Sequence, residues 1–316
     1  MRILVTGAAG FVGAHAVHHL VAAGADVVAT DLVPAAEAAR LAAPIATGVR
    51  YVAGELGSVL PEVMRGADEV WHFAANADIP LGVRDTSVDI RESVLLTRLV
   101  LEAMREHSVP LLVYPSTSGV YGSTARPVVT EADGPLLPNS LYAAGKVAGE
   151  ALVSAYCQTF GLRARILRLG NVVGGAMGRG IVRDFVRKLS EAPGRLTVLG
   201  DGCQRKSYVL VDDVIDGMRH LAAAGEAPCE VYNLAAGDSL DVNGVARAVA
   251  EALGLPMPEL VTDGVSLSWQ GDQPVVELGI AKALASGWSP RWTAAESVRI
   301  AAERIHTGAG TLAVAR

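Results

Sequence analysis

The stretch Val5–Gly13, VTGAAGFVG, decides the fold, because it joins a short apolar run to the start of a helix-length segment. Gly7, Gly10 and Gly13 recur at every third position directly after the apolar run 2–6. Glycines in a turn between a strand and a helix let the backbone approach a diphosphate, which binds at the positive end of the helix. The spacing is G-x-x-G-x-x-G rather than the commoner G-x-G-x-x-G, so the glycines alone are weak evidence and need support from the surrounding sequence.

Asp31 supplies that support, because it stands at the end of the next apolar run, 26–30. A carboxylate there accepts hydrogen bonds from the hydroxyls of an adenosine ribose and repels a 2′-phosphate. The residues that follow, 32–34, contain neither Arg nor Lys. We therefore predict that the chain binds NAD rather than NADP. The alternative interpretation is a glycine turn followed by a solvated surface aspartate.

Short apolar runs and helix-length segments alternate through the first half of the chain. The runs are typical of buried parallel strands and lie at 2–6, 26–30, 69–73, 110–116 and 163–169. The helix-length segments between them lie at 11–24, 92–107 and 140–160. Repeated strand–helix–strand order predicts an α/β fold with a Rossmann-like, doubly wound parallel sheet.

The pattern changes past residue 170, where glycines cluster at 174–180 and helical periodicity returns only in separate segments. Those segments are 181–191, 212–224, 241–253 and 293–305. We predict an NAD-binding domain over residues 1–168, to which the segment of about 205–236 returns. Most of 169–316 is expected to form a smaller C-terminal α/β lobe that binds the substrate.

Composition excludes several classes of protein. The formal net charge is −6 and no long basic block is present, which excludes nucleic-acid binding through phosphate contacts. Cys157, Cys203 and Cys229 are widely spaced, a pattern that suits a reducing compartment and predicts no metal site. Residues 1–5 lack the flanks and length expected of a signal peptide, and no uncharged apolar run approaches the roughly 18 residues of a membrane span. We expect a soluble cytoplasmic protein that binds neither nucleic acid nor membrane.

The segment YAAGK, 142–146, places a phenol and an amine on one face of a helix, because Tyr142 and Lys146 are one turn apart. A phenol loses its proton near pH 10, and a neighbouring cation stabilises the phenolate and lowers that value. The residues around the pair are small and are expected to leave room for a cofactor and a substrate: Ala143, Ala144, Gly145, Ala148 and Gly149.

A third polar group is expected beside this pair, at the end of the apolar run 110–116. Ser116, Thr117 and Ser118 stand there. A Tyr-x-x-x-Lys pattern by itself is most often a surface helix pair. Together with the glycine turn, Asp31 and the Ser/Thr cluster, it predicts an acid–base site next to the dinucleotide.

At this point the sequence resembles the extended short-chain dehydrogenase/reductases, and within them the UDP-glucose/UDP-galactose 4-epimerase-like nucleotide-sugar enzymes. The resemblance covers nearly the whole chain. In chain order, the matching pieces are TGAAGFVG (6–13), Asp31, HFAAN (72–76), STSGVYG (116–122), YAAGK (142–146), RLGNVVG (168–174), LGDGCQRKSYVLVDDV (199–214), VYNLAAG (231–237) and SGWSPRW (286–292).

The resemblance implies roles for particular positions. Tyr142 is the acid/base, Lys146 is its partner and also touches the nicotinamide ribose, and Thr117 completes the catalytic triad. The implied cofactor-binding residues are Gly7, Gly10, Phe11, Val12, Gly13, Asp31, Leu32, Glu55, Leu56, Phe73, Ala74, Ala75, Ser93, Pro115 and Ser116, with Tyr142 and Lys146. The implied substrate-binding residues are Asn76, Thr117, Ser118, Asn171, Arg179, Val182, Lys206 and Asp272.

Several positions depart from the family pattern. Glu55-Leu56 stands where the family has Asp-Leu near the adenine, a change that preserves the hydrogen bond. Ser93 replaces the usual Asn on the helix that faces the site. Trp269 stands where the best-known epimerases have an Arg before Gly-Asp, which puts a second cationic contact to the substrate diphosphate in doubt; Arg179 is the candidate replacement. Lys206 stands where many members have an Arg.

The reaction is predicted from Ser118 and Gly119, which directly follow Thr117. The sugar 4,6-dehydratases carry Asp-Glu there, an acid and a base for eliminating water. We therefore predict an NAD-dependent nucleotide-sugar 4-epimerase that acts through a transient 4-keto sugar, with a UDP-sugar as the favoured substrate. Which sugar and which base are used stays open.

Two alternatives remain at this point. One is another UDP- or dTDP-sugar dehydratase or reductase that uses a 4-keto intermediate. The other is a catalytically silent NAD-binding regulatory protein, against which the intact Thr117, Tyr142 and Lys146 argue. The family also implies a homodimer, paired through the segments 92–107 and 140–160.

Overall fold

The computed structural model describes residues 1–38, 40, 45, 47–124, 126–225, 227–262 and 275–308. Over these ranges the main sheet has seven strands, all parallel, in the order β11-β6-β5-β4-β1-β2-β3. Their bounds are β1 Arg2–Thr6, β2 Asp26–Asp31, β3 Arg50–Ala53, β4 Glu69–His72, β5 Leu111–Thr117, β6 Arg163–Leu169 and β11 Cys229–Leu234. The predicted doubly wound parallel sheet is thus confirmed.

The strand order reverses between β1 and β4. From β1 the chain winds outward through β2 to β3, and then returns to place β4 on the other side of β1. In open parallel sheets, ligands bind beyond the carboxyl ends of the strands at such a reversal. The glycine turn after β1 and the residues after β4 both lie there.

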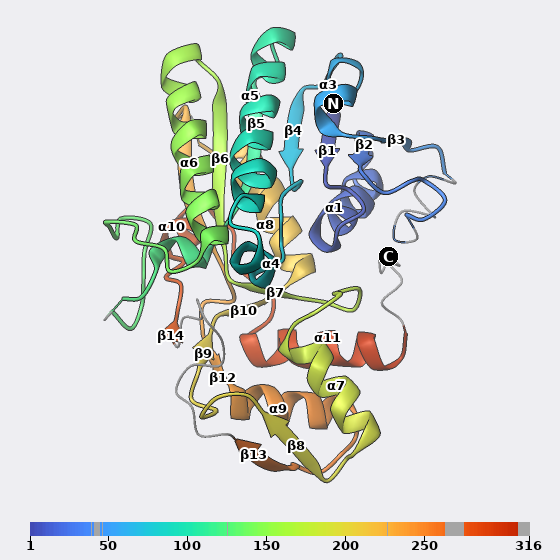
Figure 1. Ribbon diagram of the computed structural model, residues 1–316, viewed down its shortest axis with the longest axis vertical. Coiled ribbons are helices and arrows are strands. Elements are labelled where there is room, and N and C mark those ends of the chain that lie inside the picture. The colour runs from blue at the N-terminus through green and yellow to red at the C-terminus, as the bar shows by residue number, and fades with distance from the viewer. Residues whose placement is uncertain are drawn as a thin grey trace.

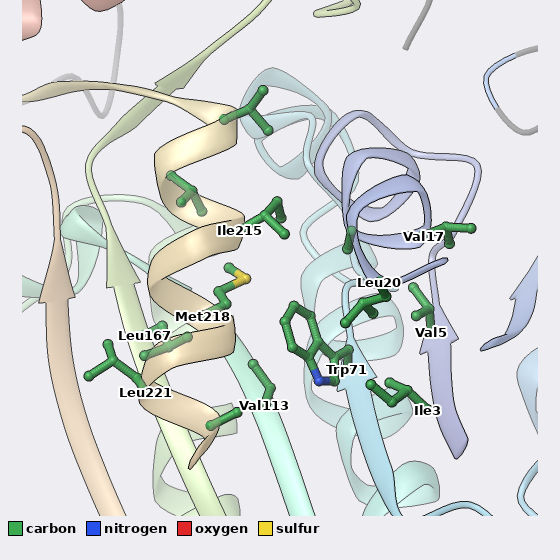
Figure 2. Close-up of a cluster of buried hydrophobic side chains, with 14 of the residues drawn as sticks. Ile3, Val5, Val17, Leu20, Trp71, Val113, Leu167, Ile215, Met218 and Leu221 are labelled. Carbon is green, nitrogen blue, oxygen red and sulfur yellow. The ribbon is translucent and has the colours of Figure 1, made fainter. Parts of the chain in front are cut away.

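Helices cover both faces of the sheet. Alternate residues of a strand point to opposite sides, so strands that are apolar throughout need packing on both faces. On one side lie α1 (Phe11–Ala22) and α8 (Val211–Ala223), and Figure 2 shows Ile3, Val5 and Trp71 packing beneath them. On the other side lie α3 (Leu56–Val63), α5 (Leu96–His107) and α6 (Leu141–Phe160), over a cluster that contains Leu4 and Leu112.

A smaller lobe lies beyond the carboxyl edge of the sheet, in the lower half of Figure 1. Its helices pack around a separate core that includes Phe185, Leu196 and Val298. The helices are α7 (Ile181–Glu191), α9 (Val242–Ala252) and α11 (Ala294–His306), and its strands are β8 (Arg195–Val198), β9 (Arg205–Lys206), β12 (Leu240–Asp241), β13 (Glu259–Thr262) and β14 (Val275–Val276). A pair formed by β7 (Asn171–Val173) and β10 (Tyr208–Leu210) lies between the two parts.

The structure adds elements that the sequence patterns did not indicate. These are β3, α3, α4 (Ile79–Arg84), α10 (Ala281–Ala285) and a 3₁₀ turn, η3, at Ser118–Tyr121. The segment 92–107, predicted as one helix, is preceded and partly replaced by a π-helical turn, η2, at Ile90–Leu95. A π-helical turn inserts an extra residue, and such turns are frequent at functional sites.

The large sheet includes a segment from the second half of the chain. Strand β11 pairs with β6, and α8 covers the face that α1 also covers. The proposed division at residues 168 and 169 stays a prediction. None of the helices in the described ranges combines the length and hydropathy that a bilayer crossing requires.

Candidate active site

The glycine turn after β1 is closed by contacts that leave no room for side chains. Gly7 has a φ of +67°, and a Cβ on it would lie 2.5 Å from the Ala74 nitrogen. A Cβ on Gly13 would lie 2.2 Å from the Gly7 carbonyl oxygen. Helix α1 begins with Gly10 as N-cap, without a side-chain cap and without an acidic residue in its first turn. Its first amide groups therefore suit an anionic ligand such as a diphosphate.

Asp31 lies at the end of β2, against this turn. One of its carboxylate oxygens accepts a hydrogen bond from the Ala9 amide at 2.9 Å, and the other accepts from the Val33 amide at 3.2 Å. The carboxylate is therefore held in a fixed orientation beside the glycine turn. The structure thus places Asp31 next to the glycine turn, as the sequence predicted.

A cavity of about 460 Å³ opens beside Asp31. Its lining comes from both parts of the molecule: Ala9, Val33, Glu37, Ala38, Arg40, Ala176 and Arg183. Leu32 is largely exposed, whereas Leu56 is buried in the core cluster under α3. Glu55 and Leu56 were proposed to lie near the adenine. Leu56 packs into the core, whereas Glu55 is exposed at the N-cap of α3.

The proposed triad is assembled from two neighbouring elements. Tyr142 lies in the first turn of α6, which Ser140 caps by accepting a hydrogen bond from the Ala143 amide. Thr117 ends β5; its hydroxyl accepts from the Gly119 amide at 3.1 Å and is hydrogen-bonded to the Tyr142 phenol. Lys146 lies one turn further along α6, is buried, and donates to the Pro115 carbonyl oxygen at 2.9 Å.

The pKa of Tyr142 differs from the sequence expectation. Burial raises the pKa to about 12, the hydrogen bond with Thr117 opposes this rise, and the carboxylate of Asp89 adds to it. Burial also lowers the pKa of Lys146 to about 8, which the negative charge of Glu150 partly opposes. The expectation that Lys146 lowers the Tyr142 pKa is therefore not met in this structure, because removing the phenol from water penalises the phenolate more strongly.

Two of the small residues of α6 pack against neighbouring elements, whereas the sequence predicted that they would leave room for a cofactor and a substrate. A Cβ on Gly149 would lie 2.0 Å from the Tyr114 hydroxyl oxygen, and one on Gly145 would lie 3.2 Å from Ser93 Cβ. These glycines let α6 approach β5 and η2 closely. Close packing of the helix, rather than open space for ligands, explains both of them.

The residues after β4 lie next to the glycine turn. The Phe73 amide donates to the Thr6 carbonyl oxygen and the Ala74 amide to the Thr6 hydroxyl, which holds Phe73–Ala75 beside Gly7. Ser93 is buried in η2, and its hydroxyl has no hydrogen-bond partner among the described residues. It thus keeps a polar atom in the place where the resemblance expects an Asn.

The proposed substrate-binding residues come from several elements of the structure. Asn171 begins β7 and Lys206 lies in β9, on the side of the smaller lobe, while Ser118 follows Thr117 in η3. Val182 is fully buried in the core of the smaller lobe, so its side chain packs rather than binds a ligand. Asp272 and Trp269 lie outside the described residues.

Asn76 and Arg179 are engaged with protein groups. The Asn76 side-chain amide donates to the Asp78 carbonyl oxygen and to the Asp89 carboxylate, and its oxygen accepts from the Asp78 amide. Both of its amide hydrogens and one lone pair of its oxygen are therefore used within the protein. Arg179 pairs with the Asp78 carboxylate at 3.1 Å. Asp78 thus links the loop after β4 to the loop before α7.

Sequence reasoning missed four charged residues around the site: Asp78, Asp89, Glu150 and Arg168. Glu150 and Arg168 form a buried ion pair. Glu150 lies one turn beyond Lys146 on the same helix, a spacing that the sequence did show. The pairing of Glu150 with Arg168, in contrast, has no local pattern in the sequence.

Comparison with known proteins identifies the family. The model of the NAD-dependent epimerase/dehydratase family matches residues 3–235, which is well over half of the chain. This chain belongs to the NAD-dependent epimerase/dehydratase family. The recognition made from the sequence motifs is thus confirmed, and NAD is the cofactor.

Individual members of the epimerase/dehydratase family match along most of the chain. A dTDP-glucose 4,6-dehydratase of Streptomyces antibioticus is 33% identical over 94% of this chain and 90% of its own length. A UDP-glucose 4-epimerase of Mycolicibacterium smegmatis is 33% identical over 81% of this chain and 84% of its own. The crystal structure of a dTDP-glucose 4,6-dehydratase from Streptomyces venezuelae with NAD bound has a TM-score of 0.86 and 30% identity, and 98% of each chain is covered.

The residues of this family member fit NAD. The turn around Gly7 and Gly13 packs so closely that a Cβ at either residue would clash with backbone atoms, the first turn of α1 has no side-chain cap, and Asp31 presents a fixed carboxylate. These are the three features that a diphosphate and an adenosine ribose need.

The fixed carboxylate of Asp31 predicts cofactor selectivity. We expect NAD⁺ to bind at least about 100-fold more tightly than NADP⁺, a difference of about 2.8 kcal/mol, because a 2′-phosphate would approach a like charge. Isothermal titration with each dinucleotide measures the two affinities. Equal affinities would contradict the assignment of Asp31 to the ribose.

Proposed function

We propose that this enzyme is a nucleotide-sugar 4-epimerase of the UDP-glucose/UDP-galactose type. The observation that carries the proposal is the arrangement at the end of β5, where Thr117 contacts Tyr142 and is followed by Ser118 and Gly119. This arrangement provides an acid–base group for a sugar hydroxyl, without an acid and a base directly after Thr117. The favoured ligand is a UDP-sugar.

The roles of the residues follow from their contacts. Bound NAD⁺ supplies the hydride acceptor and the later hydride donor for carbon 4 of the sugar. Tyr142 takes the proton of the 4-hydroxyl group and later returns it. Thr117 holds the phenol oxygen through its hydrogen bond, and its own orientation is fixed by the Gly119 amide. Lys146 contributes a positive charge on the same helical face.

A 4,6-dehydratase is the second candidate, because a dehydratase is among the relatives that match this chain at 33% identity. Elimination of water needs an acid and a base near carbons 5 and 6 of the sugar. Ser118 and Gly119 do not supply them. Of the acids near the site, Asp78 pairs with Arg179, and Asp89 is buried with one oxygen bonded to Asn76 and the other without a hydrogen-bond partner among the described residues.

The two candidates are separated by incubating the purified enzyme with UDP-glucose, UDP-N-acetylglucosamine, UDP-glucuronate and dTDP-glucose, with mass spectrometry and NMR of each product. We expect an equilibrium mixture of 4-epimers of unchanged mass from at least one UDP-sugar. Loss of the mass of one water, with appearance of a 4-keto-6-deoxy sugar, would establish the dehydratase instead. Recovery of every sugar nucleotide unchanged would contradict both.

A further inference from the structure

A buried ion pair lies beneath the triad, between α6 and β6. Arg168 Nη2 is 2.7 Å from Glu150 Oε2, and Arg168 Nε is 3.1 Å and 3.2 Å from the two carboxylate oxygens. Both side chains are less than a tenth exposed. The Ser116 hydroxyl also donates to Glu150, so this carboxylate joins α6 to the two strands β5 and β6.

Arg168 is also held on its other side. Its Nη1 donates to the Tyr121 hydroxyl at 3.0 Å, and that hydroxyl donates to Asn233 Oδ1 at 2.7 Å. The Asn233 amide group donates in turn to the carbonyl oxygens of Val129 and Gly279. The guanidinium therefore has one fixed position, with a single carboxylate, Glu150, as its ion-pair partner in the described part of the chain.

Lys146 lies between this pair and the phenol of Tyr142. Its ammonium group donates to the Pro115 carbonyl oxygen and lies 5.0 Å from the centre of the Tyr114 ring. Glu150 follows it by one helical turn, close enough for the two side chains to interact. Two cations, Lys146 and Arg168, thus share the Glu150 anion, so these three side chains carry one net positive charge when Lys146 is protonated.

The other titratable groups that face Lys146 and Tyr142 include two neutral side chains and one acid. His72 in β4 is fully buried, and burial lowers its pKa to about 3, so it is neutral. Burial raises the pKa of Tyr114 in β5, which also keeps it neutral. Asp89, next to η2, is the acid that faces Tyr142.

We propose that Glu150 and Arg168 are positioning residues, which set the charge beneath Tyr142 by keeping the Glu150 carboxylate on Arg168 and away from Lys146. The inference rests on the proposed function for its catalytic meaning. Without Arg168, the buried carboxylate would be left unpaired and Lys146 would be the cation next to it. The ammonium group would then be neutralised by Glu150 in place of acting on the phenol.

Direct titration of Lys146 tests this arrangement without any need for turnover. The chain has four lysines, Lys146, Lys188, Lys206 and Lys282, so ¹³C-lysine NMR of the NAD-loaded protein is well resolved, and a Lys146→Met sample assigns the signal. Glu150→Gln removes an anion and should lower the Lys146 pKa from about 8. Arg168→Met removes a cation and should raise it. Each shift is expected to be about one pH unit, the lower end of the roughly 1–3 units by which a nearby charge shifts a pKa.

Two further variants separate charge from folding. The double variant Glu150→Gln/Arg168→Met restores the net charge, so the Lys146 pKa should return to near its original value. Arg168→Lys keeps the cation and should leave the titration close to that of the unchanged protein. Thermal unfolding of each variant reports the cost of losing one buried partner, which the double variant should partly recover.

The pH dependence of turnover supplies the second readout. The pH–rate profile should move to lower pH in Glu150→Gln and to higher pH in Arg168→Met, whereas a merely structural role would lower turnover without moving the profile. Titrations of Lys146 that are unmoved, or that move in the same direction in both single variants, would overturn the proposal. If Lys146 titrates as expected but no nucleotide sugar is converted, the proposed function fails and the charge arrangement stands.

Discussion

Replacing Tyr142 by Phe should lower turnover about 10²–10⁴-fold while NAD and the nucleotide sugar stay bound. The substitution removes only the phenol oxygen, which is the group hydrogen-bonded to Thr117. The ring keeps its place in the first turn of α6, so the packing of the helix against η2 and β5 should survive. Steady-state turnover, with NAD content read from absorbance and sugar-nucleotide affinity from calorimetry, measures the separate effects.

Tyr156→Phe is the matched control for this substitution. Tyr156 lies on the same helix, and its hydroxyl donates to Glu102 of α5, outside the proposed site. We expect this variant to keep the turnover of the unchanged enzyme. A Tyr142→Phe enzyme that kept most of its turnover with every accepted nucleotide sugar would show that proton transfer does not depend on this phenol.

Gly13→Ala should abolish tight NAD binding. A Cβ at residue 13 would lie 2.2 Å from the Gly7 carbonyl oxygen and 3.0 Å from the Gly7 carbonyl carbon, so the turn or the helix has to move. Either movement displaces the amide groups at the start of α1 from the diphosphate. We expect affinity for NAD⁺ to fall at least about 100-fold, a loss of about 2.8 kcal/mol, by calorimetric titration.

Gly194→Ala provides the control for the glycine variant. Residue 194 lies in the turn after α7, where a Cβ meets no atom within 4 Å among the described residues. NAD binding should be unchanged there. Circular dichroism and thermal unfolding of both variants establish that the fold is intact. A folded Gly13→Ala protein with unaltered NAD affinity would refute the assignment of the glycine turn to the diphosphate.

The cofactor half of the site could be predicted from the sequence, because its parts follow local rules. Gly7, Gly10 and Gly13 stand at the junction of a strand and a helix, and Asp31 ends the adjacent strand. The alternation of apolar runs with helix-length segments determined the parallel sheet, since strands buried on both faces need apolar residues throughout. The pair Tyr142–Lys146 was also visible, because helical spacing alone places both on one face.

Tertiary structure decided the electrostatics of the site. The sequence indicated that Lys146 would lower the pKa of Tyr142, whereas burial raises it to about 12. Desolvation depends on every element that covers a group, and no local pattern records how those elements pack around Tyr142.

Tertiary structure also decided the partners of the charged and polar residues. The Asn76 side chain bonds to Asp78 and Asp89, and Glu150 pairs with Arg168 of β6, which lies eighteen residues further along the chain. The motifs therefore determined which residue types meet at the carboxyl end of the sheet. Which of them carry charge, and which partner holds each one, depends on contacts between segments far apart in sequence, and those contacts form only when the sheet and its covering helices come together.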